Sequence, residues 1–200
     1  AARRLAPSLV LGVCAGDRLQ EYGTAEPTDY LNRGAKAKAY THFMINELLP
    51  HLYAHYPCQK TAKAHTLAGF SLGGLSALDI VWHHPQHFAQ VGVFSGSLWW
   101  RSKPFDPADP DADRIMHAII AEGPQRADLR FWLQTGTADE TSDRNNNGII
   151  DAIDDTLDLI KALEQVGYQK NQNIHYLEVE GGTHTPQTWG AVMDRFLTWI

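Results

Sequence analysis

Short apolar runs rich in β-forming residues alternate along this chain with longer stretches of helical periodicity. This alternation predicts βαβ units, in which the strands pair in parallel and the helices cover the sheet. The run lengths suit fully buried strands, as a parallel sheet requires. Five strands are expected, over residues 8–14, 64–70, 90–95, 130–135 and 173–179. The chain is therefore predicted to be an α/β protein.

Five helical stretches lie between and after these strands, over residues 35–55, 72–84, 111–121, 154–166 and 188–200. Pro85 ends the second stretch because proline cannot continue a helix, and Gly167 provides a C-terminal cap for the fourth. With 200 residues, 44% of them hydrophobic, the chain can bury one good core, so a single domain is expected.

Composition narrows the classes of partner. The net charge of −6 argues against a nucleic-acid-binding surface, which needs clustered Lys and Arg. No apolar run has the length of a membrane span. The two cysteines, Cys14 and Cys58, are too few for a disulfide scaffold and leave the redox compartment open.

The strongest functional motif is G-x-S-x-G at Gly69, Ser71 and Gly73. It lies where a buried strand turns directly into a helix, which is the context of a nucleophile elbow. The glycines permit a tight turn that exposes the Ser71 hydroxyl, and the amide of Leu72 at the helix N-terminus is predicted to stabilise an oxyanion. The alternative is an ordinary serine N-cap.

A serine hydroxyl needs a base, and the base needs an orienting acid. His184 follows the last predicted strand in a Gly-rich turn at the carboxyl edge of the sheet, so it is the expected base. Asp139 follows the strand over residues 130–135 and is the first choice for the acid, with Glu140 second. Ser95 and Ser97 are rival nucleophiles without the strand–elbow–helix setting, and we interpret them as turn residues.

Several segments together resemble one family. Residues 68–78 (AGFSLGGLSAL), 94–100 (FSGSLWW), 46–50 (NELLP) and 17–22 (DRLQEY) are similar to the enterochelin-esterase-like branch of the putative-esterase family of α/β hydrolases. The resemblance implies an α/β-hydrolase fold, a mostly parallel sheet with helices on both faces. It also implies carboxylic-ester hydrolysis through an acyl-serine intermediate, with Ser71, Asp139 and His184 as the triad and no organic cofactor.

The sequence departs from this family at its start. Family members have further strands before the first one predicted here, and a loop there supplies the second oxyanion N–H. The domain over residues 1–200 is therefore expected to lack its N-terminal strands and to leave an unpaired sheet edge.

Residues 143–154 fit an EF-hand-type loop, with oxygen side chains at positions 1, 3, 5, 9 and 12 and glycine at position 6. The expected Ca²⁺ ligands are the side chains of Asp143, Asn145, Asn147, Asp151 and Asp154 and the carbonyl of Ile149. Asp at position 12 instead of Glu is a departure, and a polar turn with solvated acids is the alternative. A calcium site slightly favours a periplasmic or secreted location.

The substrate is expected to be a small ester. Trp99, Trp100 and Arg101 either contact an aromatic, siderophore-like substrate, as the resemblance suggests, or are core residues plus a surface charge. Acyl transfer to an alcohol and a non-catalytic binding module are the alternative functions. The oligomeric state is left open.

Overall fold

A four-stranded sheet organises the protein, of which the computed structural model describes residues 7–200. The strands are β1 (Thr66–Phe70), β2 (Gln90–Phe94), β3 (Arg130–Ala138) and β4 (Ile174–Thr183), and they lie in the order β1-β2-β3-β4. Every neighbouring pair is parallel. The carboxyl ends of all four strands therefore meet at one edge of the sheet.

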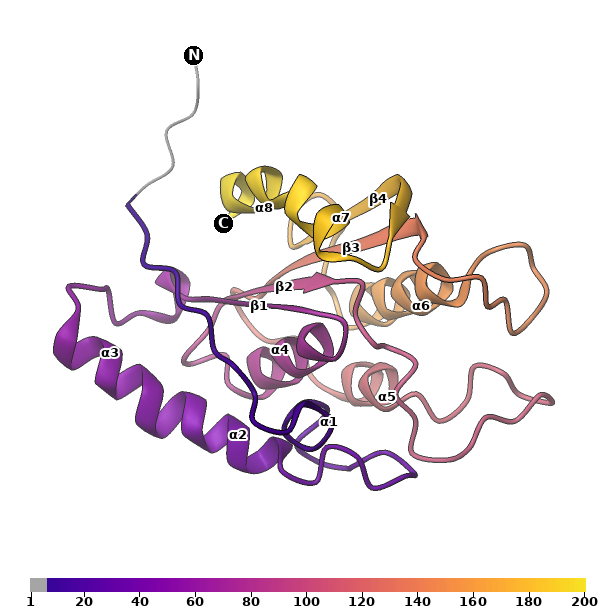
Figure 1. Ribbon diagram of the computed structural model, residues 1–200, viewed down its shortest axis with the longest axis horizontal. Helices are drawn as coiled ribbons and strands as arrows, with labels where there is room; N and C mark the ends of the chain where they lie inside the picture. The colour runs from indigo at the N-terminus through magenta and orange to yellow at the C-terminus, as the bar shows by residue number, and fades with distance from the viewer. Residues whose placement is uncertain (1–6) are drawn as a thin grey trace, which may run out of the picture.

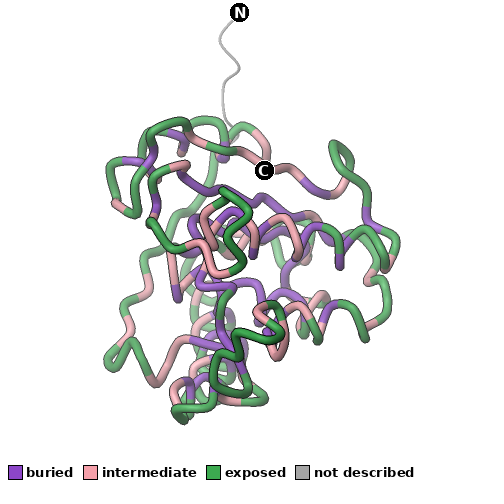
Figure 2. The backbone as a smooth tube through the Cα atoms, turned by 90° about the vertical axis from the view of Figure 1, so that its right-hand side faces the viewer, coloured by how far each residue is buried: buried purple, intermediate pink, exposed green. Residues whose placement is uncertain are grey.

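Helices cover both faces of this sheet, as expected. The crossover helices are α4 (Leu72–His83), α5 (Ile115–Glu122) and α6 (Asp151–Gln165), and they lie together below the sheet in Figure 1. Each crossover connects one strand to the neighbouring strand on the same side of it in the sheet. Because parallel crossovers of this kind are right-handed, the three helices share a face. The C-terminal helices α7 (Pro186–Ala191) and α8 (Met193–Trp199) cover the opposite face, and the buried chain of the strands runs between the two helical layers (Figures 1 and 2).

The predicted strand over residues 8–14 is wrong. This segment has no regular structure, and its side chains Leu9, Val10 and Leu11 are 51%, 80% and 48% exposed. Its β-forming composition does not suffice, because a strand requires a hydrogen-bonding partner as well as propensity. Within residues 7–200, β1 pairs with β2 alone, so its other edge has no strand beside it.

The predicted helix over residues 35–55 is present but irregular, and it follows a short helix α1 (Arg18–Glu21). It consists of α2 (Ala37–Phe43), a π-helical turn (Met44–Leu48) and α3 (Leu49–His55). Pro50 has no N–H to donate to the preceding turn. The wider π turn, closed by the Leu49 N–H donating to Met44, lies directly before this proline and accommodates it.

Other helix and strand boundaries differ from the predicted ones by a few residues. A 3₁₀ turn (Ala62–Ala64) precedes β1, and α5 begins four residues later than predicted because Asp113 has a φ of 62°, which a right-handed helix excludes. The last predicted helix is broken at Val192, whose φ of −111° separates α7 from α8. No helix within residues 7–200 is long and apolar enough to cross a membrane.

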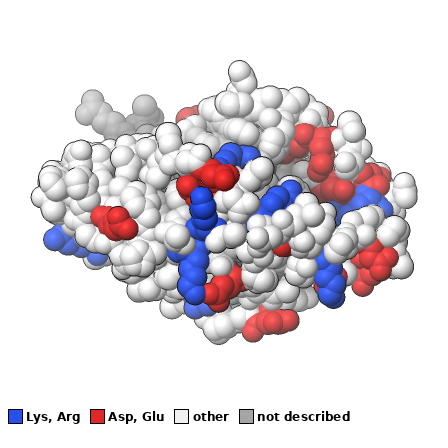
Figure 3. Space-filling model, turned by 60° about the horizontal axis from the view of Figure 1, so that its bottom comes forward, with Lys and Arg blue, Asp and Glu red and all other residues white. Residues whose placement is uncertain are grey.

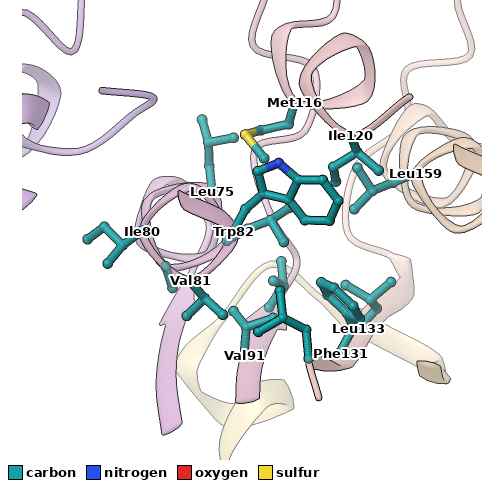
Figure 4. Packing of buried hydrophobic residues seen from close by; sticks show 14 of the residues in the cluster. Leu75, Ile80, Val81, Trp82, Val91, Met116, Ile120, Phe131, Leu133 and Leu159 are labelled. Atoms are coloured by element: carbon teal, nitrogen blue, oxygen red, sulfur yellow. The ribbon is translucent and has the colours of Figure 1, made fainter. Parts of the chain in front are cut away.

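The main core lies between the sheet and its crossover helices. Trp82 of α4 is fully buried, and Figure 4 shows its indole lying against Met116 and Ile120 of α5 and near Leu159 of α6. One large side chain thus joins the three helices. A smaller core on the other face contains Phe94, Trp132, Val192 and Phe196, which attaches α8 to the sheet.

A buried ion network joins α5, α6 and the loop before α6. The Asp155 carboxylate, whose side chain is 2% exposed, lies 2.7 Å from Arg114 Nη1 and 2.9 Å from Arg144 Nη2. Arg114 also pairs with Asp158, and Arg144 with Asp111, at 2.8 and 2.7 Å. Acidic and basic side chains lie next to one another at this end of the molecule (Figure 3). Asp111, Asp155 and Asp158 therefore help to hold α5, α6 and the loop before α6 together.

His117 beside this network should make folding sensitive to acid. Its Nε2 lies 2.8 Å from the Asp155 carbonyl, so it donates there, while its buried Nδ1 has no hydrogen-bond partner within the described residues. Burial, and then the Arg114 charge, lower the pKa of His117 to about 3. The unfolded chain, with an imidazole pKa of about 6.5, therefore binds one more proton than the folded chain between about pH 6.5 and about pH 3.

Stability should consequently fall in this window as the pH drops, by up to about 1.4 kcal/mol per pH unit from this one group. Urea unfolding at pH 7 and pH 5 measures the dependence. The His117→Gln variant should show a smaller difference between the two pH values, and His42→Gln, at an exposed site, should behave as the native protein does. Equal pH dependence in all three proteins would contradict the role of His117.

Candidate active site

The segment from β1 to α4 has the backbone of a nucleophile elbow. Ser71 adopts φ 56° and ψ −123°, a conformation that serine rarely occupies outside such strained turns. A Cβ on Gly69 would lie 2.1 Å from the Gly73 carbonyl oxygen, so only glycine fits at this position, two residues before the serine. As the first residue of α4, Leu72 has a backbone N–H without an intrahelical acceptor. The turn therefore presents a hydroxyl and an amide donor side by side.

The turn after β2 holds the elbow in place. The Ser71 N–H donates to Phe94 at 2.9 Å, and the Ser97 N–H donates to the Ser71 carbonyl at 3.1 Å. The Ser71 and Ser97 hydroxyl oxygens lie 3.3 Å apart. Ser97 is buried, and so is Ser95, which supports the interpretation of both as turn residues beside the site. The direct contact of Ser97 with Ser71 was not predicted, since nothing in local sequence relates the two turns.

His184 and Asp139 meet at the same edge of the sheet. His184 Nδ1 lies 3.9 Å from Asp139 Oδ1, which is longer than a hydrogen bond. The other carboxylate oxygen, Oδ2, accepts the Gly136 N–H at 3.0 Å. Oδ1 is buried and has no hydrogen-bond partner within the described residues. A buried carboxylate oxygen without a donor is costly, and the imidazole N–H is the donor placed nearest to satisfy it.

Glu140 is directed elsewhere. Its carboxylate accepts a backbone hydrogen bond from Ala152 in α6, while burial raises its pKa above the ordinary value. Of the two candidate acids, Asp139 is thus the one facing His184. Within residues 7–200 the hydrogen-bond partner of the Ser71 hydroxyl is Ser97 and not His184, so the structure assembles the acid with the base but leaves the base apart from the serine. Hydrogen bonds of this kind often tighten only when substrate binds.

The three residues proposed from sequence to bind substrate have different environments. Trp100 is fully buried in the core, so its role in contacting a substrate is not supported. Arg101 is buried too, and its guanidinium donates to the carbonyls of Ala112 and Pro110. Trp99 is 41% exposed. Trp99 and Arg101 line the same groove, whereas Trp100 between them packs in the core.

A groove of about 440 Å³ opens beside this turn. Three aromatic side chains line it, and each is about half exposed: Tyr30 (44%), Trp99 (41%) and Phe105 (46%). Its remaining lining is polar and includes Arg101, Ser142, Asp143, Arg144 and Asp151. Both arginines are already paired with carbonyls or carboxylates. The groove therefore offers aromatic surface more than free positive charge.

The loop over residues 143–154 folds back on itself. Asp143 accepts the backbone N–H groups of Asn147 and Gly148 at 3.1 and 2.9 Å. The side-chain amides of Asn145 and Asn147 donate to Asp154 Oδ2 at 3.2 and 2.8 Å. Positions 1, 3, 5 and 12 of the predicted calcium loop therefore converge, and Gly148 at position 6 has a φ of 86° that favours glycine.

Asp151 does not join this group, because its carboxylate faces Arg144, with Arg144 Nη1 at 3.2 Å and the Arg144 backbone N–H at 2.8 Å. Within residues 7–200, no three His, Cys, Asp or Glu side chains lie close enough to hold a metal ion by themselves. A cation at this loop would therefore depend on Asn145 and Asn147 as well as Asp143 and Asp154. Turning the two amides over would present their oxygens, since amide orientation follows the partner present.

A parallel sheet between helical layers, with a serine at positive φ between β1 and α4, defines an α/β hydrolase. Comparison with known proteins agrees with this class. The model of the family described as "Putative esterase" matches residues 1–200, and the chain belongs to this esterase family.

The chain matches only part of the length of each individual relative. The iron(III) salmochelin esterase of Escherichia coli O6:H1 is 33% identical over 129 residues, which are 62% of this chain and 29% of that protein. The iron(III) enterobactin esterase of Dickeya dadantii is 27% identical over 157 residues, 76% of this chain and 33% of that protein. The chain thus spans about a third of the length of these relatives.

Solved structures support the fold. The enterobactin esterase FES from Shigella flexneri superposes with a TM-score of 0.62 at 24% identity, over 80% of this chain and 38% of that one. The BES protein from Bacillus cereus superposes with a TM-score of 0.60 at 18% identity, over 94% of this chain and 65% of that one. At identities this low, the superpositions show the fold of the chain but do not identify its substrate.

Proposed function

We propose that this protein hydrolyses carboxylic esters, with Ser71 as nucleophile, His184 as general base and Asp139 as the orienting acid. The observation that carries the proposal is the strained φ of 56° at Ser71 between β1 and α4. Such a conformation costs on the order of 1–3 kcal/mol and persists where the exposed hydroxyl has a use. Membership of the esterase family supports the same reaction.

The roles follow from the positions of the groups. His184 accepts the proton of the Ser71 hydroxyl as its oxygen attacks the ester carbonyl carbon. The N–H of Leu72 donates to the oxyanion that forms on the carbonyl oxygen. When this intermediate collapses, the alcohol leaves with the proton from His184. Water, activated by the same base, then releases the acid from the acyl-serine. The test is turnover of p-nitrophenyl acetate by the native chain and by Ser71→Ala.

We propose further that the substrate carries an aromatic group, which binds in the groove lined by Tyr30, Trp99 and Phe105. Three half-exposed aromatic side chains around one groove suit stacking against a planar ring. The groove adjoins the turn that contains Ser97, and Ser97 contacts Ser71, so a bound ring would lie on the chain segment next to the nucleophile. The relatives named as salmochelin and enterobactin esterases point to siderophore-like esters within this class.

Trp99→Ala should raise KM for an aromatic ester more than for an acetyl ester. Stacking contributes about 0.5–1.5 kcal/mol beyond area burial, so a rise in KM of roughly threefold to tenfold is expected for p-nitrophenyl 2,3-dihydroxybenzoate. The KM for p-nitrophenyl acetate should change less, since it has the same leaving group but no aromatic acyl group to stack in the groove. Phe43→Ala, at a half-exposed aromatic outside the groove, is the control. An equal rise with both esters would contradict the assignment of the groove.

The third part of the proposal is a structural Ca²⁺ ion at the loop over residues 143–154, held by Asp143, Asn145, Asn147, Asp154 and the Ile149 carbonyl. When bound, the ion supplies positive charge that offsets the repulsion between Asp143 and Asp154. Asp139 precedes Asp143 by four residues, so an ordered loop would also restrain the acid that faces His184. Asp151, which faces Arg144, takes no direct part.

Removing calcium should lower Tm first and activity second. At a free calcium concentration of 100 times Kd the stabilisation should be about 2.7 kcal/mol. The measurement is a melting curve in chelator, then with calcium restored. Asp143→Ala should melt at one temperature in both conditions, whereas Asp109→Ala, which removes an exposed charge outside the loop, should respond as the native protein does. A native Tm indifferent to both additions would disprove the site.

A further inference from the structure

Trp189 in α7 contacts three separate segments around the candidate site. Its Nε1 donates to the Ser95 hydroxyl at 2.9 Å. Its ring stacks on Phe70, with centroids 5.0 Å apart and an interplanar angle of 26°. The ring of His184 meets it edge to face, with centroids 5.2 Å apart and an angle of 83°. The sequence alone places Trp189 only within the helical stretch predicted over residues 188–200.

One contact is to the proposed base, His184, and the other two are to residues that support the nucleophile. Phe70 is the residue directly before Ser71 and packs in turn against Phe94 of β2. Ser95 lies in the same turn as Ser97, whose hydroxyl contacts that of Ser71. The indole therefore touches the proposed base on one side and the supports of the nucleophile on the other. It joins the β4–α7 turn to the elbow across about 115 residues of sequence.

His184 needs such a support because its own turn is exposed. The imidazole is 42% exposed, and its carboxylate neighbour Asp139 lies 3.9 Å away. The backbone before it is held at Gly181, whose N–H donates to the Thr137 hydroxyl at 2.8 Å, and at Thr183, whose N–H donates to the Thr188 hydroxyl at 2.9 Å. These hydrogen bonds hold the backbone of the turn and not the imidazole. Asp139 can orient one ring nitrogen, but the plane of the imidazole is set by the indole against which it packs.

The hydrogen bond to Ser95 fixes the indole itself. Ser95 is 2% exposed and has a φ of 46°, and its N–H donates to the Gln134 carbonyl of β3 at 2.7 Å. The acceptor is thus attached to the centre of the sheet. The Trp189 side chain donates to one acceptor on a rigid strand end, and its ring stacks on Phe70. It therefore has little freedom to rotate.

We propose that Trp189 is a positioning residue that holds the imidazole of His184 at the distance and angle from Ser71 that proton transfer requires. This inference rests on the proposed ester hydrolysis. Trp189 acts through the imidazole against which it packs, so its loss should slow the chemical step without weakening substrate binding. Misplacing a catalytic group by about 1 Å can cost about 10²-fold in rate.

The experiment compares kcat and KM for p-nitrophenyl acetate, and the rate at which a fluorophosphonate labels the nucleophilic serine, across a set of variants. Trp189→Leu removes the ring and should lower kcat and the labelling rate by about 10²-fold, with KM within about twofold of native. Trp189→Phe keeps a ring but has no N–H, and Ser95→Ala removes its acceptor. Each should lower kcat by about tenfold, and the double variant should lose no more, because both remove one hydrogen bond.

Trp199 provides the matched control, since it is a tryptophan of the neighbouring helix whose contacts within residues 7–200 are to Trp132, Phe196 and Arg130. Trp199→Leu should leave kcat near native. Native-like kcat in Trp189→Leu, or equal losses in Trp189→Leu and Trp199→Leu, would overturn the role of Trp189, and so would a loss confined to KM. If Trp189→Leu does not fold by circular dichroism, additive losses in the Trp189→Phe and Ser95→Ala pair would overturn it instead.

Turnover that survives Ser71→Ala would overturn the proposed function itself. Turnover that is lost in Ser71→Ala but unchanged by substitution of Trp189 would overturn only this inference.

Discussion

Replacing Ser71 by alanine is expected to lower kcat for p-nitrophenyl acetate by at least about 10³-fold, because the members of a catalytic triad act as a unit. Alanine removes the nucleophile and keeps the strained backbone, which a Cβ already tolerates at this position. The groove, the Leu72 amide and the fold should all persist in the variant. The loss should therefore appear in kcat with an unchanged Tm, and the fluorophosphonate label should disappear.

Two neighbouring carboxylates sharpen this test. Asp139→Asn should cost heavily in kcat, since Asp139 Oδ1 is the buried, unpaired oxygen facing His184. Glu140→Gln should cost little, because Glu140 is directed to the backbone of Ala152. The reverse order would move the acid to Glu140. No turnover in the native chain, alongside none in Ser71→Ala, would favour the alternative of a binding module that kept the fold.

The features predicted well from sequence are those encoded within short segments. The strand that contains Gly69, the turn at Ser71 and the helix that follows are specified by the consecutive residues Thr66 to His83. All four strands of the sheet were predicted within a few residues at each start, because buried parallel strands are continuous apolar runs. Their ends were less accurate: β3 and β4 continue three or four residues further, into the polar turns that carry Asp139 and His184.

What could not be predicted depends on partners distant in sequence. Residues 8–14 have the composition of a strand, but no strand of the described chain pairs with them. Trp99 and Trp100 are alike in sequence, yet Trp99 lines a groove and Trp100 is core, and only the packing around the turn after β2 distinguishes them. The sequence offers calcium binding or solvation for the acidic residues of the loop over residues 143–154, and no role for Asp155 directly after it. Asp155 instead binds two arginines that lie 41 and 11 residues before it.

Asp155→Ala should be strongly destabilising although it lies outside the site. It leaves the guanidinium groups of Arg114 and Arg144, whose side chains are 6% and 5% exposed, without their shared partner in the protein interior. Breaking a buried pair by removing one member costs about 3–5 kcal/mol, much of it from the charge left unpaired. For a chain of this size that is a fall in Tm on the order of 10 °C.

Thermal melts at low and high salt would measure this loss and its origin. Lys63→Ala breaks an exposed pair with Asp128, whose side chains are 72% and 60% exposed, and should change Tm little, because water and salt screen such pairs. Replacing the buried group, as Arg114→Met, Arg144→Met and Asp155→Leu together, should recover much of the stability lost in Asp155→Ala, since the carboxylates that then lose an arginine, Asp111, Asp151 and Asp158, are partly exposed and can be hydrated. A Tm for Asp155→Ala within about 1 °C of that for Lys63→Ala would show that the network is hydrated and contributes little. A loss that the triple replacement does not recover would assign the effect to packing of the Asp155 side chain between α5 and α6 instead of to its charge.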